Sequence, residues 1–191
     1  MVQFQKWFAE ARQADIPDWM EINAMTLATS DPHGGVTSRV VLLKGIEDDR
    51  LLFFTNYDSD KGNQIAANPQ VSLCFFWPHL ERQVRIDGTA GKADRQVSSD
   101  YFHRRPRASQ LGAHVSRQST EVPGRETLED RMQELETQYA DQDVPCPDNW
   151  GGYEVVPTKF EFWQGRPSRL HDRICYQKSA DGTWTIVRLS P

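Results

Sequence analysis

Three basic side chains near the end of the chain are spaced to act together. Arg169, His171 and Arg173 follow the turn-forming residues 165 to 168. The sequence therefore predicts a strand from residue 169, and alternate residues of a strand lie on one face. The three side chains would form a cationic row that suits an extended, phosphate-bearing ligand. The alternative is a solvated basic edge strand, where charge opposes aggregation.

Two further groups of polar residues lie on or beside other predicted strands. Arg39 and Lys44 belong to an otherwise apolar strand, where they either bind an anion or reach past the core to solvent. Thr55, Ser59 and Lys61 lie where a strand passes into a helix N-terminus. Backbone N–H groups and the helix dipole favour phosphate there, although caps of this kind are common in helices that bind nothing.

A fourth group lies in the predicted helical region. Tyr101, Arg105 and Ser109 are spaced by four, as one face of a helix requires, and Pro106 interrupts that helix. These residues either hold a second phosphate or cover the surface. Sequence spacing alone does not choose between the two.

Composition limits the classes of protein that can be considered. The 191 residues, 38% hydrophobic, suffice for one domain spanning 1–191 with a full core. A net charge of −5 disfavours a general nucleic-acid binder. Three cysteines without a CxxC pair indicate neither a disulfide framework nor a zinc knuckle, and no apolar run reaches membrane-spanning length. We expect a cytoplasmic protein with no nucleic-acid or membrane partner.

Strands dominate the element pattern. The sequence predicts strands over 25–30, 36–44, 51–56, 71–77 and 83–88, and a last hairpin of strands 169–177 and 184–189. An amphipathic helix with Phe4, Trp7, Phe8 and Ala11 on one stripe begins the chain and belongs to a lead-in over 1–23. The pattern indicates an antiparallel barrel with short helical inserts.

Four helices are expected between these strands. One is capped by Asp58 or Ser59 and ends near 68–69, and another is capped by Ser98 or Ser99 and limited by Pro106. A third starts at Pro106. The fourth carries an apolar face of Leu128, Met132, Leu135 and Tyr139.

Familiar catalytic motifs are absent. The sequence has no GxGxxG after a strand, no GxxxxGK[ST], no HExxH and no GxSxG. Neither a Rossmann site, a P-loop, a metal site nor a serine hydrolase is therefore indicated.

Taken together, the polar segments resemble the pyridoxamine 5'-phosphate oxidase family. The segments that carry the resemblance keep the family's order: RVVLLK (39–44), FFTN (53–56), LERQV (80–84), YFHRRPRASQ (101–110), VSRQS (115–119), WGG (150–152) and FWQGRPSRLHDR (162–173). The resemblance covers residues from about 24 to 191.

The resemblance implies a mainly β (α+β) fold, an FMN-binding split β-barrel that is antiparallel with short peripheral helices. It implies a homodimer with FMN at the subunit interface and a substrate-binding hairpin over 160–191. The implied reaction oxidises pyridoxine 5'-phosphate or pyridoxamine 5'-phosphate to pyridoxal 5'-phosphate. O2 reoxidises the flavin and yields H2O2, and the amine substrate also releases NH3.

The resemblance also assigns residues. The implied FMN contacts are Arg39, Val40, Val41, Leu42, Leu43, Lys44, Phe54, Thr55, Lys61, Gln83, Gln118, Ser119, Trp163 and Arg173. The implied substrate contacts are Lys44, Tyr101, Arg105, Ser109, Arg169 and His171. Arg169 and His171 would lie over the reacting carbon as the catalytic pair, with His171 either removing a proton or orienting the ring. No metal is implied.

The resemblance has departures and alternatives. Asp60 stands where the family often has Arg, which predicts weaker FMN binding. The family also commonly has an Arg- and Tyr-bearing segment ahead of the first helix, for which this sequence shows no obvious equivalent. Another flavin-dependent split-barrel enzyme, of the phenazine-biosynthesis type, would not need the pair Arg169 and His171. A non-catalytic protein that binds FMN or pyridoxal phosphate is the other alternative.

Overall fold

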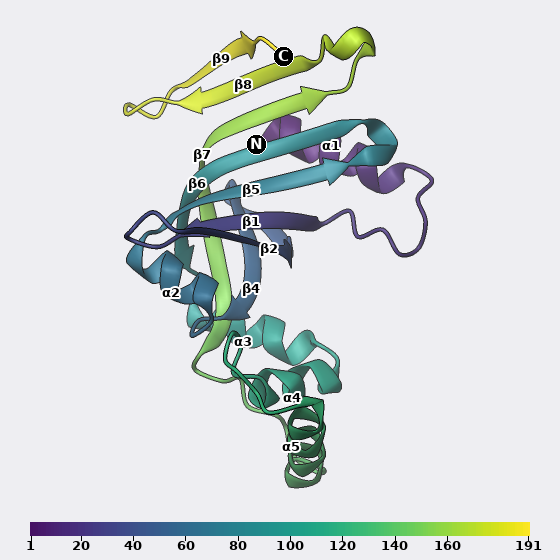
Figure 1. Ribbon diagram of the computed structural model, residues 1–191, viewed down its shortest axis with the longest axis vertical. Helices are drawn as coiled ribbons and strands as arrows, with labels where there is room; N and C mark the ends of the chain where they lie inside the picture. Colours follow the sequence, from purple (N-terminus) through teal and green to yellow (C-terminus); the bar gives the residue numbers. More distant parts are fainter.

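One antiparallel sheet of nine strands organises the molecule. The structure is a computed structural model that describes residues 1–191 (Figure 1). The strands are β1 (Ala24–Ser30), β2 (Val36–Leu42), β3 (Gly45–Glu47), β4 (Arg50–Asn56), β5 (Gln70–Trp77), β6 (Arg82–Lys92), β7 (Trp150–Gln164), β8 (Asp172–Lys178) and β9 (Trp184–Leu189). Their order is β2-β1-β5-β6-β7-β4-β3, and β8 and β9 extend from β7. The sheet curls until β2 and β4, which are not paired, approach each other.

The long strand β7 divides the sheet into two arms. One edge of β7 pairs with β6, while the other edge pairs with β4 as far as Val155 and with β8 from Lys159. Pro157 lies in the gap between these two partners, where that edge of β7 has no ladder to interrupt. Opposite it, Gly88 marks a register shift, and a Cβ there would lie 2.5 Å from the Val156 carbonyl oxygen. Pro157 and Gly88 together allow β7 to change partners.

Five short helices surround the sheet, as the sequence predicts. They are α1 (Val2–Gln13), α2 (Asp60–Ala67), α3 (Arg95–Arg104), α4 (Arg107–Val115) and α5 (Arg125–Gln138). The helices α3 to α5 gather at the lower end of Figure 1, and β8 and β9 lie at its upper end. The mainly β, antiparallel expectation is confirmed.

Two hydrophobic clusters hold these elements. In the main core, Phe4 of α1 is fully buried and packs against Phe75 and Phe160 of the sheet. The stripe predicted for this helix is therefore confirmed. A smaller cluster of Phe102, Leu111, Leu135, Val144 and Trp150 joins α3, α4 and α5 to the start of β7.

The helix caps agree with the sequence at α2 and differ at α3. Ser59 caps α2, and its hydroxyl accepts from the N–H of Gly62. The cap of α3 is Asp94, whose carboxylate accepts from the N–H of Gln96. The prediction of Ser98 or Ser99 was wrong because the Ser98 hydroxyl instead donates back to the Asp94 carbonyl.

The strand predicted from residue 169 was also wrong at its start. Residues 167–169 form a single 3-10 turn, and Ser168 and Arg169 have φ of 58° and 59°. β8 begins at Asp172, so Arg169, His171 and Arg173 do not form one row on a strand face. Pro167, whose fixed φ suits the first position of a turn, begins the 3-10 turn. The loop therefore extends past residue 169, where the alternation of basic residues starts in the sequence.

Candidate functional site

A cavity of about 930 Å³ opens between the curled sheet and the helices α2, α3 and α4. Thirteen of the predicted site residues line it: Arg39, Val40, Val41, Leu42, Lys44, Phe54, Thr55, Lys61, Tyr101, Arg105, Ser109, Gln118 and Ser119. Its volume lies in the upper part of the range for small-molecule sites, roughly 300–1,000 Å³. Residues that are far apart in the sequence therefore line the same cavity.

Lys61 is the most constrained cation of the cavity. Only 7% of the residue is exposed, and its ammonium donates to Gln118 Oε1 at 2.6 Å, Ser59 Oγ at 3.1 Å and Thr55 Oγ1 at 3.2 Å. Burial, with a smaller contribution from the nearby charge of Arg39, lowers the pKa of Lys61 to about 8. The three acceptors are neutral, so the buried charge lacks a carboxylate partner.

Arg39 adds a second positive charge beside Lys61. Its guanidinium donates to Thr29 Oγ1 at 2.6 Å and Thr37 Oγ1 at 2.5 Å, again to neutral oxygens. Burial lowers the pKa of Arg39, partly offset by the charge of Asp60. The Ser59-capped N-terminus of α2 lies next to both cations and adds its own positive potential. This corner of the cavity, which we call the α2 corner, suits an anion.

Arg105 forms a second cationic position, on the helical side. Its guanidinium lies 4.7 Å from the centre of the Trp150 ring, and its Nη1 is buried without a hydrogen-bond partner. Burial also lowers the pKa of Arg105. A buried guanidinium nitrogen without a partner is costly, and an anionic ligand would satisfy it.

Residues on two helices converge at Arg105. Tyr101 lies on α3, Ser109 lies on α4, and the break at Pro106 comes between them. All three predicted residues of this group nevertheless line the same cavity. We call this side the α3–α4 corner; Lys44 lines the same cavity.

An aromatic stack forms the wall behind this corner. The ring of Phe54 lies 3.9 Å from that of Tyr101 and 5.5 Å from that of Trp150, and the planes are within 15° of parallel. Trp150 is a lining residue that the sequence analysis did not assign, although the WGG segment signalled it. Other unassigned lining residues are Asn56, Asp60, Pro106, Gly112, Ala113 and Ser116.

Six predicted residues lie outside the cavity. Leu43 is buried in the main core. Gln83, Trp163 and Arg173 are paired across β6, β7 and β8, so they share one face of the sheet with the 59% exposed Phe76 of β5. We call Gln83, Trp163 and Arg173 the outer row; they follow the arm of the sheet that β8 joins, and β8 lies near the upper end of Figure 1, away from α3 and α4.

Arg169 and His171 lie beside the outer row. The ring of His171 is 4.7 Å from that of Trp163, and its Nδ1 accepts from the backbone N–H of Arg166 at 3.1 Å. Arg169 is exposed and makes no side-chain hydrogen bond. Arg173 donates through Nε to Glu161 at 3.0 Å. The predicted site residues therefore fall into two surfaces of one chain.

Two other features are absent from the fold. No helix is long and apolar enough to cross a membrane. No group of three or more His, Cys, Asp or Glu side chains is placed to hold a metal ion.

Family profiles and sequence relatives all indicate the same protein family. A family profile described as "Pyridoxamine 5'-phosphate oxidase" matches residues 10–139, and one described as "Pyridoxine 5'-phosphate oxidase C-terminal dimerisation region" matches residues 150–191. A relative from Rhodopirellula baltica named "Pyridoxine/pyridoxamine 5'-phosphate oxidase" is 58% identical over 100% of this chain and 86% of its own. One of the same name from Ralstonia pickettii is 53% identical over 99% of this chain and 87% of its own.

Solved structures agree in fold. The crystal structure of PhzG from Burkholderia lata, in complex with tetrahydrophenazine-1-carboxylic acid, has a TM-score of 0.92 and 27% identity, covering 100% of this chain and 91% of that chain. An FMN-binding protein from Nostoc punctiforme, related to pyridoxamine 5'-phosphate oxidase, has a TM-score of 0.76 and 16% identity, covering 100% and 96%. The expected split-barrel fold is confirmed.

Proposed function

Since the chain belongs to the pyridoxamine 5'-phosphate oxidase family, we propose that it uses FMN to oxidise pyridoxine 5'-phosphate or pyridoxamine 5'-phosphate to pyridoxal 5'-phosphate. O2 would be the electron acceptor and give H2O2, with NH3 released from the amine. The observation that carries the proposal is the cavity with two separate cationic corners, because a phosphorylated cofactor and a phosphorylated substrate each bring one phosphate.

The α2 corner fits the FMN phosphate. Lys61 and Arg39 carry positive charges whose present partners are neutral oxygens, and the N-terminus of α2 adds N–H donors. Gln118 and Ser119 lie beside them with side chains that suit ribityl hydroxyls. Asp60 lies in the same corner and opposes an anion, consistent with the weaker FMN binding expected from the sequence.

The α3–α4 corner fits the substrate phosphate. Arg105 offers its unpartnered Nη1, and Lys44, Tyr101 and Ser109 add one charge and two hydroxyls. Charge-assisted hydrogen bonds to phosphate are roughly twice as strong as neutral ones. The phosphate would therefore supply much of the binding energy that fixes the substrate ring.

The outer row would complete the site from a second copy. Gln83, Trp163 and Arg173 are implied FMN contacts, yet they lie outside the cavity of their own chain. Residues 150–191, which include two of them, match the dimerisation region. A homodimer in which the outer row of one subunit faces the cavity of its partner would reconcile the two surfaces.

The chain's contribution to the reaction would be positioning. Held by the α2 corner, FMN would supply the redox chemistry, which is hydride acceptance from the substrate carbon and transfer of two electrons to O2. The two cationic corners hold the two phosphates, which fixes the reacting groups at a productive separation. In neutral His171, Nδ1 accepts a hydrogen bond, so the proton lies on Nε2. This favours His171 as a donor that orients the substrate over His171 as a base.

The charge of Lys61 predicts a pH dependence of FMN binding. Because the pKa of Lys61 in the protein without FMN is about 8, the charged fraction of Lys61 falls as the pH rises above that value. An anion binds the charged form better, so the Kd for FMN is expected to increase from about pH 7 to about pH 9, by at most tenfold per pH unit. Flavin fluorescence titration measures this. Lys61→Gln should bind more weakly at pH 7 and show a flatter profile, and equal slopes for the two proteins would contradict the assignment.

Arg169→Ala is expected to lower turnover by about tenfold or more while FMN stays bound. Arg169 is exposed and free of side-chain hydrogen bonds, so its guanidinium is available to the substrate across the dimer interface. Steady-state kinetics and the flavin absorbance of the purified variant measure both quantities, with Arg125→Ala on α5 as an exposed control. Loss of the flavin instead would show that Arg169 serves the cofactor.

The proposal as a whole is tested by aerobic turnover of FMN-loaded protein with pyridoxine 5'-phosphate, following aldehyde and peroxide together. Equal amounts of both products, with little from unphosphorylated pyridoxine, are expected. No product while FMN is bound would favour a carrier that binds without turnover.

The likeness to PhzG supports a second candidate, a flavin-dependent oxidase of the phenazine type. A phenazine precursor of the kind bound to PhzG carries a carboxylate and no phosphate, so it would offer the α3–α4 corner a different anion. Oxidation of such a precursor, with no activity on the phosphorylated vitamers, would favour this candidate.

A further inference from the structure

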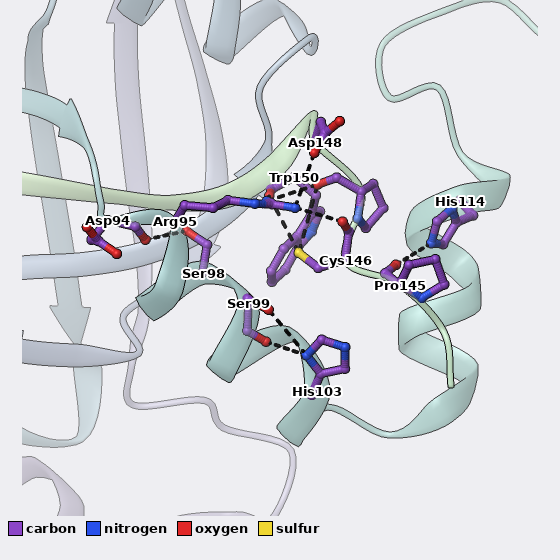
Figure 2. Close-up of polar contacts among 11 residues, drawn as sticks. Asp94, Arg95, Ser98, Ser99, His103, His114, Pro145, Cys146, Asp148 and Trp150 are labelled. Atoms are coloured by element: carbon purple, nitrogen blue, oxygen red, sulfur yellow. Dashed lines mark hydrogen bonds and ion pairs between the residues drawn. The ribbon is translucent and has the colours of Figure 1, made fainter. Parts of the chain in front are cut away.

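A clamp outside the cavity holds the segment that leads into β7. The Arg95 guanidinium, from the first turn of α3, donates to three backbone carbonyl groups: Cys146 at 2.7 Å, Trp150 at 2.9 Å and Pro147 at 3.1 Å (Figure 2). Three bonds from one rigid guanidinium fix the path of the backbone between Cys146 and Trp150. An ion pair of Arg95 with Asp148 at 3.5 Å is exposed and adds little.

A second contact ties the same segment to α4. His114 Nε2 donates to the Pro145 carbonyl at 2.7 Å, as Figure 2 also shows. The helices α3 and α4, which carry Tyr101 and Ser109 and flank Arg105, are thus each attached to residues 145–150 by one side chain. The segment and the two helices are held as one unit.

The clamped segment ends at a residue of the cavity wall. The Trp150 ring lies against Phe54 and beneath the Arg105 guanidinium, at 5.5 Å and 4.7 Å between centres. Phe102 packs on Trp150 edge-on at 5.3 Å. The plane of Trp150 therefore decides where Arg105 lies, because the guanidinium rests on the indole face and has no carboxylate partner.

We propose that Arg95 is a positioning residue: by clamping residues 146–150 it sets the Trp150 ring and thereby aims Arg105 at the substrate phosphate. That the anion is the substrate phosphate rests on the proposed function. Arg95 itself does not line the cavity. Its loss should therefore affect recognition of the phosphate and leave the α2 corner unchanged.

The test measures binding as well as turnover. In Arg95→Ala, the Kd for pyridoxal 5'-phosphate is expected to increase by about tenfold, with the Kd for unphosphorylated pyridoxal and for FMN nearly unchanged. The KM for pyridoxine 5'-phosphate should increase more than kcat decreases. Arg125→Ala, which removes an exposed arginine of α5 paired to Glu129, is the matched control.

A spectroscopic readout follows the ring directly. In protein labelled with 5-fluorotryptophan, the 19F resonance of Trp150, identified by its loss in Trp150→Phe, should shift or broaden in Arg95→Ala and not in Arg125→Ala. Arg95→Lys keeps one donor group. Relative to Arg95→Ala, it should recover part of the affinity for pyridoxal 5'-phosphate and part of the wild-type position of the Trp150 resonance. If Arg95→Ala is poorly folded, the comparison of Arg95→Lys with wild type carries the test.

Two outcomes would overturn the inference. One is a lower Tm of Arg95→Ala with an unchanged ratio of the Kd for pyridoxal 5'-phosphate to the Kd for pyridoxal. That result would make Arg95 a structural residue only. The other is an unmoved Trp150 resonance despite weaker phosphate binding. Absence of turnover in wild-type protein that still prefers pyridoxal 5'-phosphate over pyridoxal would count against the proposed function alone.

Discussion

Arg105→Ala is expected to lower kcat/KM for pyridoxine 5'-phosphate by roughly 30-fold or more, with FMN still bound. The Arg105 Nη1 is buried and unpartnered, so the ligand phosphate would be its first strong acceptor. Removing one member of a buried, hydrogen-bonded charge pair costs about 2–5 kcal/mol, and each 1.4 kcal/mol corresponds to about tenfold. The substrate phosphate would lose its principal guanidinium partner.

The control and the competing outcome are both accessible by steady-state kinetics. Arg131→Ala removes an exposed arginine of α5 that pairs with Glu134, and it should leave kcat/KM unchanged. Activity toward unphosphorylated pyridoxine should be equally low in wild type and Arg105→Ala, because that substrate never uses the contact. An equal loss on both substrates would indicate that Arg105 supports the fold of the corner and does not bind phosphate.

Local patterns predicted seven of the nine strands because their faces differ in polarity, and they missed β3 and the long strand β7. In β6, Val84 and Ile86 are buried while Arg85 between them is exposed, and this alternation is visible in the sequence. The cap of α2 at Ser59 was equally predictable, since a hydroxyl before a short amphipathic segment is a strong local signal. Such features depend on neighbours in sequence, so the sequence alone specifies them.

Features that depend on contacts between distant segments were not predictable from local patterns. The turn at Ser168 and Arg169 requires two residues with positive φ, which alternation does not indicate. The part played by Trp150 depends on Arg95, 55 residues away, and on the approach of α3 to β7. The separation of the site into a cavity and an outer row is likewise a consequence of strand order, and no local pattern indicates that Gln118 lines the cavity while Gln83 lies outside it.

In the proposed function, the two surfaces would contribute different kinds of contact to one reaction. The cavity holds buried cations whose charges lack anionic partners, which favours tight binding of phosphates. The outer row places Trp163 between Gln83 and Arg173, and an aromatic side chain there would suit the face or edge of a planar ring. If the dimer brings them together, each subunit supplies anchoring to one site and ring contacts to the other.

Gly62→Ala is expected to destabilise the protein and weaken FMN binding together. Gly62 is the third residue of α2, and a Cβ there would lie 2.0 Å from the Tyr57 carbonyl oxygen and 2.6 Å from its carbonyl carbon. Because these are backbone atoms, the first turn of α2 must move, and Ser59 and Lys61 would move with it. Overpacking of this kind costs about 1–3 kcal/mol or more, whereas the higher helix propensity of alanine returns only about 1 kcal/mol.

Gly112→Ala is the matched control for the stability effect. Gly112 also lies in a helix, α4, but a Cβ there meets no atom within 4 Å. Alanine should therefore stabilise α4 slightly through helix propensity, by at most about 1 kcal/mol, and the two glycine variants should change the Tm of apoprotein in opposite directions. For Gly62→Ala, a Tm lowered by several degrees and a weaker FMN affinity should appear together. An unchanged Tm would mean that the loop at Tyr57 yields without cost, and the α2 corner would then not depend on the close approach at Gly62.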